Sequence, residues 1–199
     1  MIEEFRTHIT KGFAILVVLL MCIGESHWDD ALPSLTTMMI FSGILLVGVA
    51  SAGRLWCSLY IAGYKTNRLV TQGPYSMCRN PLYFFSFIGA VGVGLSSETF
   101  IIPLLILVAF GLYYPFVIRK EEKRLLHLHR EEFKRYLSRV PRFFPKLSLL
   151  EEPLHYQVKP VRFKKQMFDV LWFVWVLGVI EIIEECHRQD IFPAIITIY

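Results

Sequence analysis

Two short stretches of the sequence hold most of the side chains that could bind a small polar molecule. The first, residues 67–83, contains Arg79 and the tyrosines Tyr75 and Tyr83. The second, residues 119–122, reads Arg-Lys-Glu-Glu. Carboxylates can bind hydroxyl or amino groups, guanidinium groups can hold a carboxylate or phosphate, and aromatic rings offer a surface to another ring or a cation. Together, these groups suit a polar, charged cosubstrate.

Five apolar segments predict the helices that must position these two stretches. They comprise residues 12–24 with flanking residues, 35–53, 82–97, 99–118, and 170–180 with flanking residues. A helix that crosses a bilayer needs about 20 residues, and a mean hydropathy of +0.47 with 54% hydrophobic residues exceeds what a soluble domain shows. We therefore predict an all-α, polytopic integral membrane protein with about five transmembrane helices, built as a single membrane domain over residues 1–199.

The third and fourth segments are separated by a single residue, Glu98, so we predict a helical hairpin over residues 82–118. Because the two outer ends of an antiparallel hairpin lie at the same interface, Tyr83 and Ile118 are expected to be neighbours. The two stretches that hold the polar side chains should therefore meet at one membrane surface.

The distribution of charge predicts which side of the membrane this surface faces. The whole chain has a net charge of +4, whereas residues 119–165 hold 14 Lys or Arg and 6 Glu, a local charge of +8. The positive-inside rule places this segment, the connection 63–81 and the N-terminus in the cytoplasm, here of a bacterial inner membrane. Basic charge beside a membrane attracts anionic lipid, so we expect membrane lipids, and no nucleic acid, as partners.

A cytoplasmic amphipathic helix is predicted after the fourth segment. From Glu121 to about Pro141, apolar residues recur with a period near 3.6 and charged residues lie between them. We expect this helix to lie on the membrane surface, with Glu121 and Glu122 one turn before Leu125 and able to face the same buried side.

Three local features are predicted to be structural. Asn80 should cap the helix that Pro81 begins. Arg54, at the end of the second segment, should reach the membrane interface by snorkelling. The four cysteines are scattered, and His127 and His129 face different sides of a helix, so no metal site is predicted.

Two motifs resemble those of one membrane enzyme family. Residues 67–83 read NRLVTQGPYSMCRNPLY, which resembles the LVTxGPYxxxRHPxY signature of isoprenylcysteine carboxyl methyltransferases, and residues 121–145 resemble their EExxL, Tyr and VPRF pattern. Two motifs in order, with a hairpin between them, make the resemblance specific. It implies an integral-membrane methyltransferase of the isoprenylcysteine carboxyl and phospholipid methyltransferase type, with S-adenosylmethionine as cofactor. The catalytic core would span residues 63–145, and residues 146–199 would form a C-terminal extension with the last transmembrane helix.

The resemblance also implies which residues contact the cofactor. By position they are Asn67, Arg68, Leu69, Val70, Tyr75, Asn80, Pro81, Leu82, Tyr83 and Glu121. Asn80 stands where the family usually has His. Because an Asn side chain keeps a donor and an acceptor but does not titrate near pH 7, a hydrogen bond to the cofactor survives this change and a proton-transfer role does not.

The mechanism predicted from these residues is displacement of the methyl group from the sulfonium to an acceptor presented from the bilayer. The acceptor would be a lipophilic molecule, either an isoprenoid or lipid carboxylate or a lipid headgroup. A carboxylate acceptor needs only orientation by an arginine such as Arg119 or Arg142, and Arg119 is the nearest match to a substrate-facing arginine of the family. An amine acceptor needs a base, for which Glu122 is the candidate. The sequence leaves both acceptors open.

Two other functions fit parts of the pattern. An NAD(P)H-dependent membrane reductase of the sterol-reductase type shows a comparable Pro-Tyr and Tyr-Val-Pro architecture. A non-enzymatic lipid-binding protein with a decayed motif is supported by Asn80. The pair Glu121-Glu122 and the turn Gly73-Pro74-Tyr75 favour methyl transfer over both.

Overall fold

The computed structural model describes residues 12, 15–26, 28, 31–62, 64, 68–189, 191 and 195–198. Residues 15–23 are helical. The elements that follow are β1 (Gly24–Ser26), α3 (Pro33–Ile61), α4 (Pro74–Met77), α5 (Pro81–Leu95), α6 (Ile101–Arg139), the 3₁₀ turn η1 (Leu147–Leu149), α7 (Pro160–Val170), α8 (Trp172–Arg188) and β2 (Ile196–Ile198). Apart from the short parallel pair of β1 and β2, the described chain is helical, which confirms the predicted all-α class.

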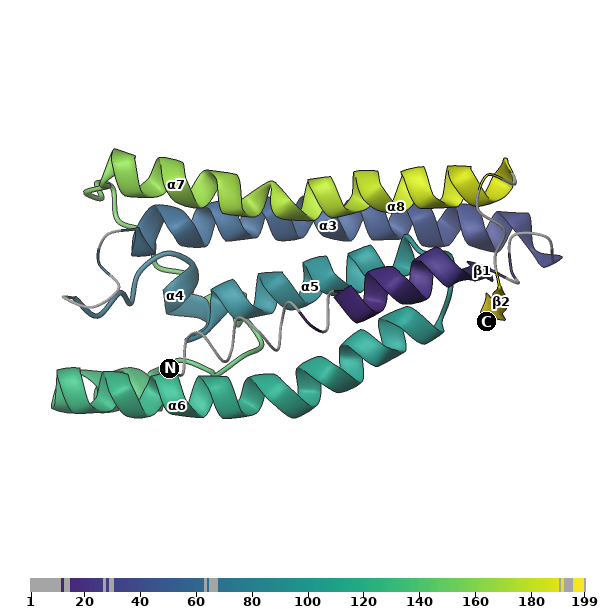
Figure 1. Ribbon diagram of the computed structural model, residues 1–199. Coiled ribbons are helices and arrows are strands. Elements are labelled where there is room, and N and C mark those ends of the chain that lie inside the picture. The colour runs from purple at the N-terminus through teal and green to yellow at the C-terminus, as the bar shows by residue number, and fades with distance from the viewer. Residues whose placement is uncertain are drawn as a thin grey trace.

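The helices form an elongated bundle, with α7 and α8 lying end to end along α3, and α5 between α3 and α6 (Figure 1). Within the described residues, three helices are long and apolar enough to cross a membrane, namely α3, α6 and the continuous stretch Pro160–Arg188. These contain the predicted segments 35–53 and 170–180 and, from residue 101 onward, the segment 99–118. Segment 82–97 corresponds to α5, which is apolar but only 15 residues long. The arrangement is that of a membrane protein.

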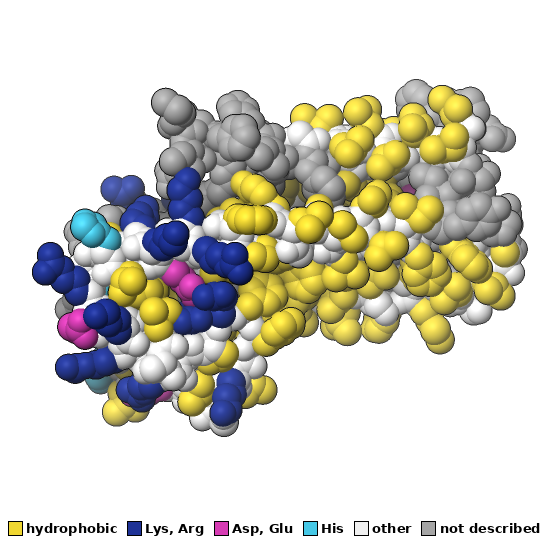
Figure 2. Space-filling model, turned by 90° about the horizontal axis from the view of Figure 1, so that it is seen from below, with side chains coloured by type: hydrophobic (Ala, Val, Ile, Leu, Met, Phe, Trp, Pro, Cys, Tyr) yellow, Lys and Arg dark blue, Asp and Glu magenta, His cyan; other side chains and the backbone are white. Residues whose placement is uncertain are grey.

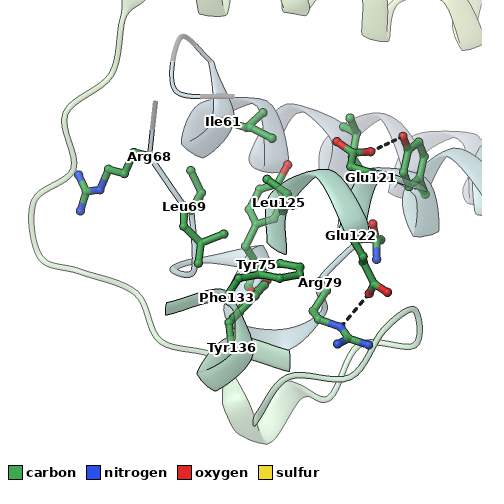
Figure 3. Close-up of a pocket in the computed structure, with 14 residues that line it drawn as sticks. Ile61, Arg68, Leu69, Tyr75, Arg79, Glu121, Glu122, Leu125, Phe133 and Tyr136 are labelled. Carbon is green, nitrogen blue, oxygen red and sulfur yellow. Dashed lines mark hydrogen bonds and ion pairs between the residues drawn. The ribbon is translucent and has the colours of Figure 1, made fainter. Parts of the chain in front are cut away.

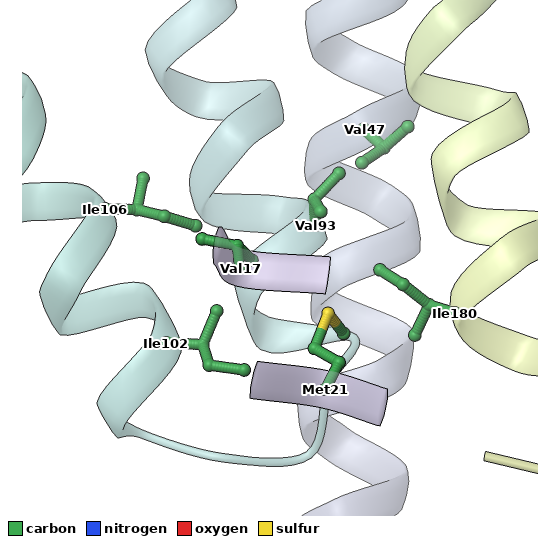
Figure 4. Close-up of a cluster of buried hydrophobic side chains, with 7 residues drawn as sticks. All are labelled: Val17, Met21, Val47, Val93, Ile102, Ile106 and Ile180. Carbon is green, nitrogen blue, oxygen red and sulfur yellow. The ribbon is translucent and has the colours of Figure 1, made fainter. Parts of the chain in front are cut away.

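Helices α3 and α5 approach each other closely through two glycines. A Cβ atom at Gly43 would lie 2.6 Å from the carbonyl oxygen of Gly92, and one at Gly92 would lie 2.8 Å from the carbonyl oxygen of Gly43. Both distances are shorter than van der Waals contact, so only glycine lets these backbones touch. A cluster of buried aliphatic side chains then ties helix 15–23 to α3, α5, α6 and α8 (Figure 4), and it consists of Val17, Met21, Val47, Val93, Ile102, Ile106 and Ile180.

The predicted amphipathic helix is present as the second part of α6, which ends at Arg139, close to the predicted end at Pro141. It differs from the prediction in being continuous with the fourth apolar segment. Helix α6 continues from its apolar part without a break to Arg130, whose backbone has φ 39° and ψ −109°. No glycine or proline lies between Ile118 and Arg130, and Lys, Glu, Arg and Leu all favour a helix. Beyond the bend, Phe133 and Tyr136 pack against Leu69 and are buried in protein, where a surface helix would have presented them to lipid.

Basic side chains gather at one end of the molecule, and hydrophobic side chains cover the length of the bundle beyond it (Figure 2). We call this the basic end. It contains the part of α6 that follows Ile118, with Arg119, Lys120, Lys123 and Arg124 all exposed. The clustering agrees with the charge pattern of the sequence, while the cytoplasmic orientation of this end stays a prediction.

Candidate functional site

A cavity opens at the basic end, between the last turn of α3, the segment that precedes α4, the start of α5 and the bend of α6 (Figure 3). Its walls combine charged, phenolic and apolar side chains. They are Ile61, Arg68, Leu69, Val70, Tyr75, Arg79, Asn80, Leu82, Tyr83, Glu121, Glu122, Leu125, Phe133 and Tyr136. The two stretches that the hairpin was predicted to bring together therefore line one cavity.

A glycine turn places Tyr75 in the cavity wall. Gly73 has φ +60°, and its N–H donates to the carbonyl oxygen of Glu151 at 2.9 Å. A Cβ atom there would lie 2.4 Å from the Tyr60 ring, so both the backbone conformation and the space require glycine. The hydroxyl of Tyr136 then donates to the carbonyl oxygen of Tyr75 at 2.6 Å, which ties the turn to the bent end of α6.

The hydroxyl of Tyr75 is buried, and it has no hydrogen-bond partner among the described residues. Burial raises the pKa of Tyr75 well above its ordinary value, so the group stays protonated and able to donate. A buried hydroxyl without a partner costs free energy. In the wall of a cavity, such a donor indicates a ligand that accepts a hydrogen bond.

Tyr83 and Glu121 form the contact that joins the two motifs. The Tyr83 hydroxyl donates to Oε2 of Glu121 at 2.7 Å, across 38 residues of sequence. The ring of Tyr83 also packs edge-on against Tyr114 of α6, with ring centroids 5.3 Å apart. These contacts confirm that the outer ends of the hairpin are neighbours. Within the described residues, Oε1 of Glu121 accepts no hydrogen bond from protein.

Glu122 lies between two arginines. Its Oε1 is 3.3 Å from Nε of Arg79, and its Oε2 is 3.1 Å from Nη2 of Arg142. The side chains of Arg79 and Glu122 are 10% and 12% exposed, whereas that of Arg142 is 50% exposed. Ion pairs that are largely shielded from water hold their geometry better than surface pairs. Glu122 therefore fixes the loop that carries Arg142 against the cavity.

The same loop is held by the residues that precede α5. Asn80 stands just before α5, as predicted for a cap, but its side chain makes no capping bond, and its Nδ2 donates to the carbonyl oxygen of Arg142 at 2.9 Å. The thiol of Cys78 donates to the carbonyl oxygen of Phe143 at 2.9 Å, and burial raises the pKa of Cys78 to about 11. The bonds satisfy carbonyl groups of a loop that has no secondary structure of its own.

Most of the residues implied by the family resemblance line the cavity. They are Arg68, Leu69, Val70, Tyr75, Asn80, Leu82, Tyr83, Glu121 and Glu122. Asn67 lies outside the described residues. Pro81 is buried at the start of α5 and does not line the cavity. Arg119 is exposed on α6 away from it, and Arg142 reaches it only through Glu122.

Sequence reasoning missed Ile61, Phe133 and Tyr136 as parts of the cavity wall. Phe133 and Tyr136 are three residues apart and therefore share a helix face, which could have identified them as a pair. Their direction depends on the bend at Arg130, because a straight continuation of α6 would carry them away from Leu69.

Comparison with known proteins identifies the family of this chain. A family model described as phospholipid methyltransferase matches residues 35–132. The chain is 39% identical to the nickel-cobalt-cadmium resistance protein NccN of Alcaligenes xylosoxydans xylosoxydans, over 99% of this chain and 91% of that protein. It is 38% identical to the cobalt-zinc-cadmium resistance protein CzcN of Cupriavidus metallidurans, over 99% of this chain and 90% of that protein. No solved structure matches the chain. The chain belongs to the phospholipid methyltransferase family of integral-membrane methyltransferases.

Proposed function

We propose that the protein transfers a methyl group from S-adenosylmethionine to a lipophilic acceptor at the membrane interface of the basic end. The observation that carries the proposal is the pairing of Tyr83 with Glu121 beside the unpartnered hydroxyl of Tyr75, within one cavity. It supports binding of a molecule that offers both donors and acceptors.

The residues of the cavity suit the parts of S-adenosylmethionine, which when bound supplies an already activated methyl group. Glu121 would accept hydrogen bonds from ribose hydroxyls, and the Tyr75 hydroxyl would donate to a ring nitrogen or carboxylate oxygen. Leu69, Leu125 and Phe133 provide an apolar wall for adenine. Arg68 is exposed at the rim, where a guanidinium can hold a carboxylate.

The contribution of the protein to the transfer is positioning and exclusion of water. The bond from Lys146 N–H to the carbonyl oxygen of Met77 and the bond from Asn80 to the carbonyl oxygen of Arg142 hold the loop 140–146 against the residues that precede α5. The bend of α6 contributes Phe133 and Tyr136 to the cavity wall. A fixed approach of donor and acceptor in a dry site supplies most of the rate enhancement when the methyl group needs no activation.

Calorimetry of the full-length protein in detergent, with S-adenosylhomocysteine and with NADPH, tests the proposal. We expect saturable binding of S-adenosylhomocysteine and no binding of NADPH. Binding of NADPH alone would instead favour a membrane reductase, and binding of neither would favour a lipid-binding protein. Mass spectrometry of lipid extracts from cells with and without the protein then identifies the acceptor by the mass of one added methyl group.

Glu122 is proposed to act as a positioning residue, since both of its oxygens already contact guanidinium groups. A proton taken up there would displace one of those contacts. We expect Glu122→Gln to raise the KM for S-adenosylmethionine about tenfold, with little change in kcat or in the shape of the kcat against pH profile. Transfer of labelled methyl groups to a membrane lipid extract provides the measurement.

Glu131→Gln is the matched control for Glu122→Gln, because Glu131 pairs with Lys134 on the exposed face of the same helix. It should leave both constants unchanged. A loss of a general base lowers kcat by about a hundredfold to ten-thousandfold. If Glu122→Gln lowers kcat by that factor and removes one limb of the pH profile, Glu122 is the base of an amine methylation.

The names of the two relatives connect them with resistance to nickel, cobalt, zinc and cadmium ions. We extend the proposal to this role: the methylated product would support growth of the cell in the presence of these metal ions. Growth of a catalytically impaired variant in the presence of these ions tests it.

A further inference from the structure

From its position near the end of α3, Arg54 was predicted to extend to the water interface, but in the structure its side chain does not. It lies seven residues before Ile61, which is about 10 Å of helix rise. Its Nη1 donates to the hydroxyl of Ser86 on α5, and its guanidinium lies over the ring of Phe173 on α8, 5.5 Å from the ring centroid. The prediction of snorkelling was wrong because this side chain points across the bundle toward α5 and α8.

Three helices meet around this guanidinium. Gly89, one turn after Ser86 on α5, is so close to α8 that a Cβ atom there would lie 2.8 Å from the Phe173 ring. Helix α8 lies outside residues 35–132, which the family model matches. The setting of Arg54 therefore combines α3 and α5, which lie within the matched region, with a helix that lies beyond it.

Arg54 lies behind the wall of the cavity. The Ser86 hydroxyl, which accepts from Arg54, donates in turn to the carbonyl oxygen of Leu82, a cavity residue. The titratable groups close enough to act on the charge of Arg54 are Tyr114, Cys57, Asp169 and Tyr75. Tyr75 lines the cavity, and Tyr114 packs against Tyr83. Through Ser86 and Leu82, the guanidinium is joined to the wall of the cavity in which we propose methyl transfer.

The guanidinium is held but not neutralised by its neighbours. Nε of Arg54 is buried without a hydrogen-bond partner, and within the described chain no carboxylate forms an ion pair with it. Asp169 is exposed on α7. An arginine within membrane-spanning helices is costly unless it is paired, and such residues mark substrate sites. Because the Ser86 hydroxyl accepts one hydrogen bond and the Phe173 ring contacts only the face of the guanidinium, other N–H donors of Arg54 stay available to an anion.

We propose that Arg54 binds the anionic group, phosphate or carboxylate, of an amphiphilic acceptor that enters from the bilayer. This orients the acceptor with its chain in the hydrocarbon and its reactive end toward Tyr75 and Tyr83. The fork of a guanidinium matches two oxygens of either anion. The role as acceptor site rests on the proposed methyl transfer, whereas the binding of the anion does not.

The test uses full-length protein in dodecyl maltoside micelles, titrated with dodecyl phosphate, laurate or uncharged dodecanol, with thermal stability as the readout. We expect at least one anionic probe to raise the melting temperature and dodecanol to leave it unchanged. In Arg54→Gln the apparent affinity for that probe should fall about tenfold or more, while S-adenosylhomocysteine still binds as in the wild type. A response to dodecyl phosphate alone identifies a phosphate amphiphile, and a response to laurate alone identifies a carboxylate.

Arg124→Gln is the matched control, since it removes an exposed arginine of α6 that does not line the cavity. Arg124→Gln should behave as the wild type. Arg54→Lys keeps the charge but loses the guanidinium fork, so it should bind the probe more tightly than Arg54→Gln and more weakly than the wild type. The inference is overturned if neither anion binds, if Arg54→Gln responds as the wild type does, or if Arg54→Lys is as weak as Arg54→Gln. If the wild type binds the anionic probe but not S-adenosylhomocysteine, the proposed methyl transfer fails and the anion site stands.

A measurement on the wild type covers the case in which Arg54→Gln does not fold. Raising NaCl from about 0.1 M to about 0.5 M screens exposed charges far more than partly buried ones. The response to the anionic probe should therefore persist at high salt. A response that disappears belongs to the exposed lysines and arginines of the basic end, and it would overturn the inference.

Discussion

Replacing Glu121 with glutamine is expected to lower both the affinity for S-adenosylhomocysteine and the rate of methyl transfer by about a hundredfold. The substitution keeps the size of the side chain and removes the charge that accepts from Tyr83 at 2.7 Å and from ligand hydroxyls. Hydrogen bonds to charged groups contribute about 1.5–3 kcal/mol each, and a hundredfold change corresponds to about 2.7 kcal/mol. Calorimetry gives the affinity, and labelled methyl transfer to a lipid extract gives the rate.

Glu132→Gln is the control for this substitution, because it removes an exposed carboxylate from the same helix. It should alter neither quantity. The Glu121→Gln variant is also the one to test for growth with nickel, cobalt, zinc or cadmium ions. If this variant binds S-adenosylhomocysteine like the wild type, the site has been placed wrongly; if it only grows like the wild type on these metals, the resistance role fails and methyl transfer stands.

Replacing Gly43 with leucine is expected to destabilise the protein by about 3 kcal/mol, the upper part of the range for an overpacked interior. A Cβ atom at this position would be 2.6 Å from the carbonyl oxygen of Gly92, which is a backbone atom and cannot rotate away. The two helices that carry Arg54 and Ser86 would be forced apart. The free energy of unfolding in mixed micelles, with increasing sodium dodecyl sulfate, measures the change.

Gly48→Leu is the matched control, because Gly48 lies five residues later on the same helix and a Cβ atom there has no neighbour within 4 Å. It should change the free energy of unfolding by less than about 0.5 kcal/mol. Equal stability of the two leucine variants would show that α3 and α5 do not pack through Gly43.

The proximity of residues 67–83 and 119–122 could be predicted from sequence because it follows from a short-range rule. Two apolar segments separated by one residue must run antiparallel, and their outer ends then lie at one interface whatever else the chain does. Apolar length and the distribution of Lys and Arg supplied the helical class and the basic end in the same way. Each of these properties depends on the composition of a continuous stretch of residues, so it can be predicted without knowing any distant contact.

The bend of α6 could not be predicted in this way. It depends on the backbone of one residue, Arg130, in a sequence that favours a straight helix. The bend turns Phe133 and Tyr136 toward Leu69, and with them it completes the cavity wall. The stability of such a turn comes from contacts with residues about 60 positions away, and these are absent from any local pattern.

Sequence alone therefore determined that this chain is a helical membrane protein, and that residues 67–83 and 119–122 lie together at its basic end. The sequence also identified the motifs of the family, because a motif is defined by residue types and their order along the chain. Only the tertiary structure decided that Glu122 is held between Arg79 and Arg142, and that Arg54 points to Ser86 and Phe173. The physical reason is that the direction of a long charged side chain is set by which distant helix offers it a partner.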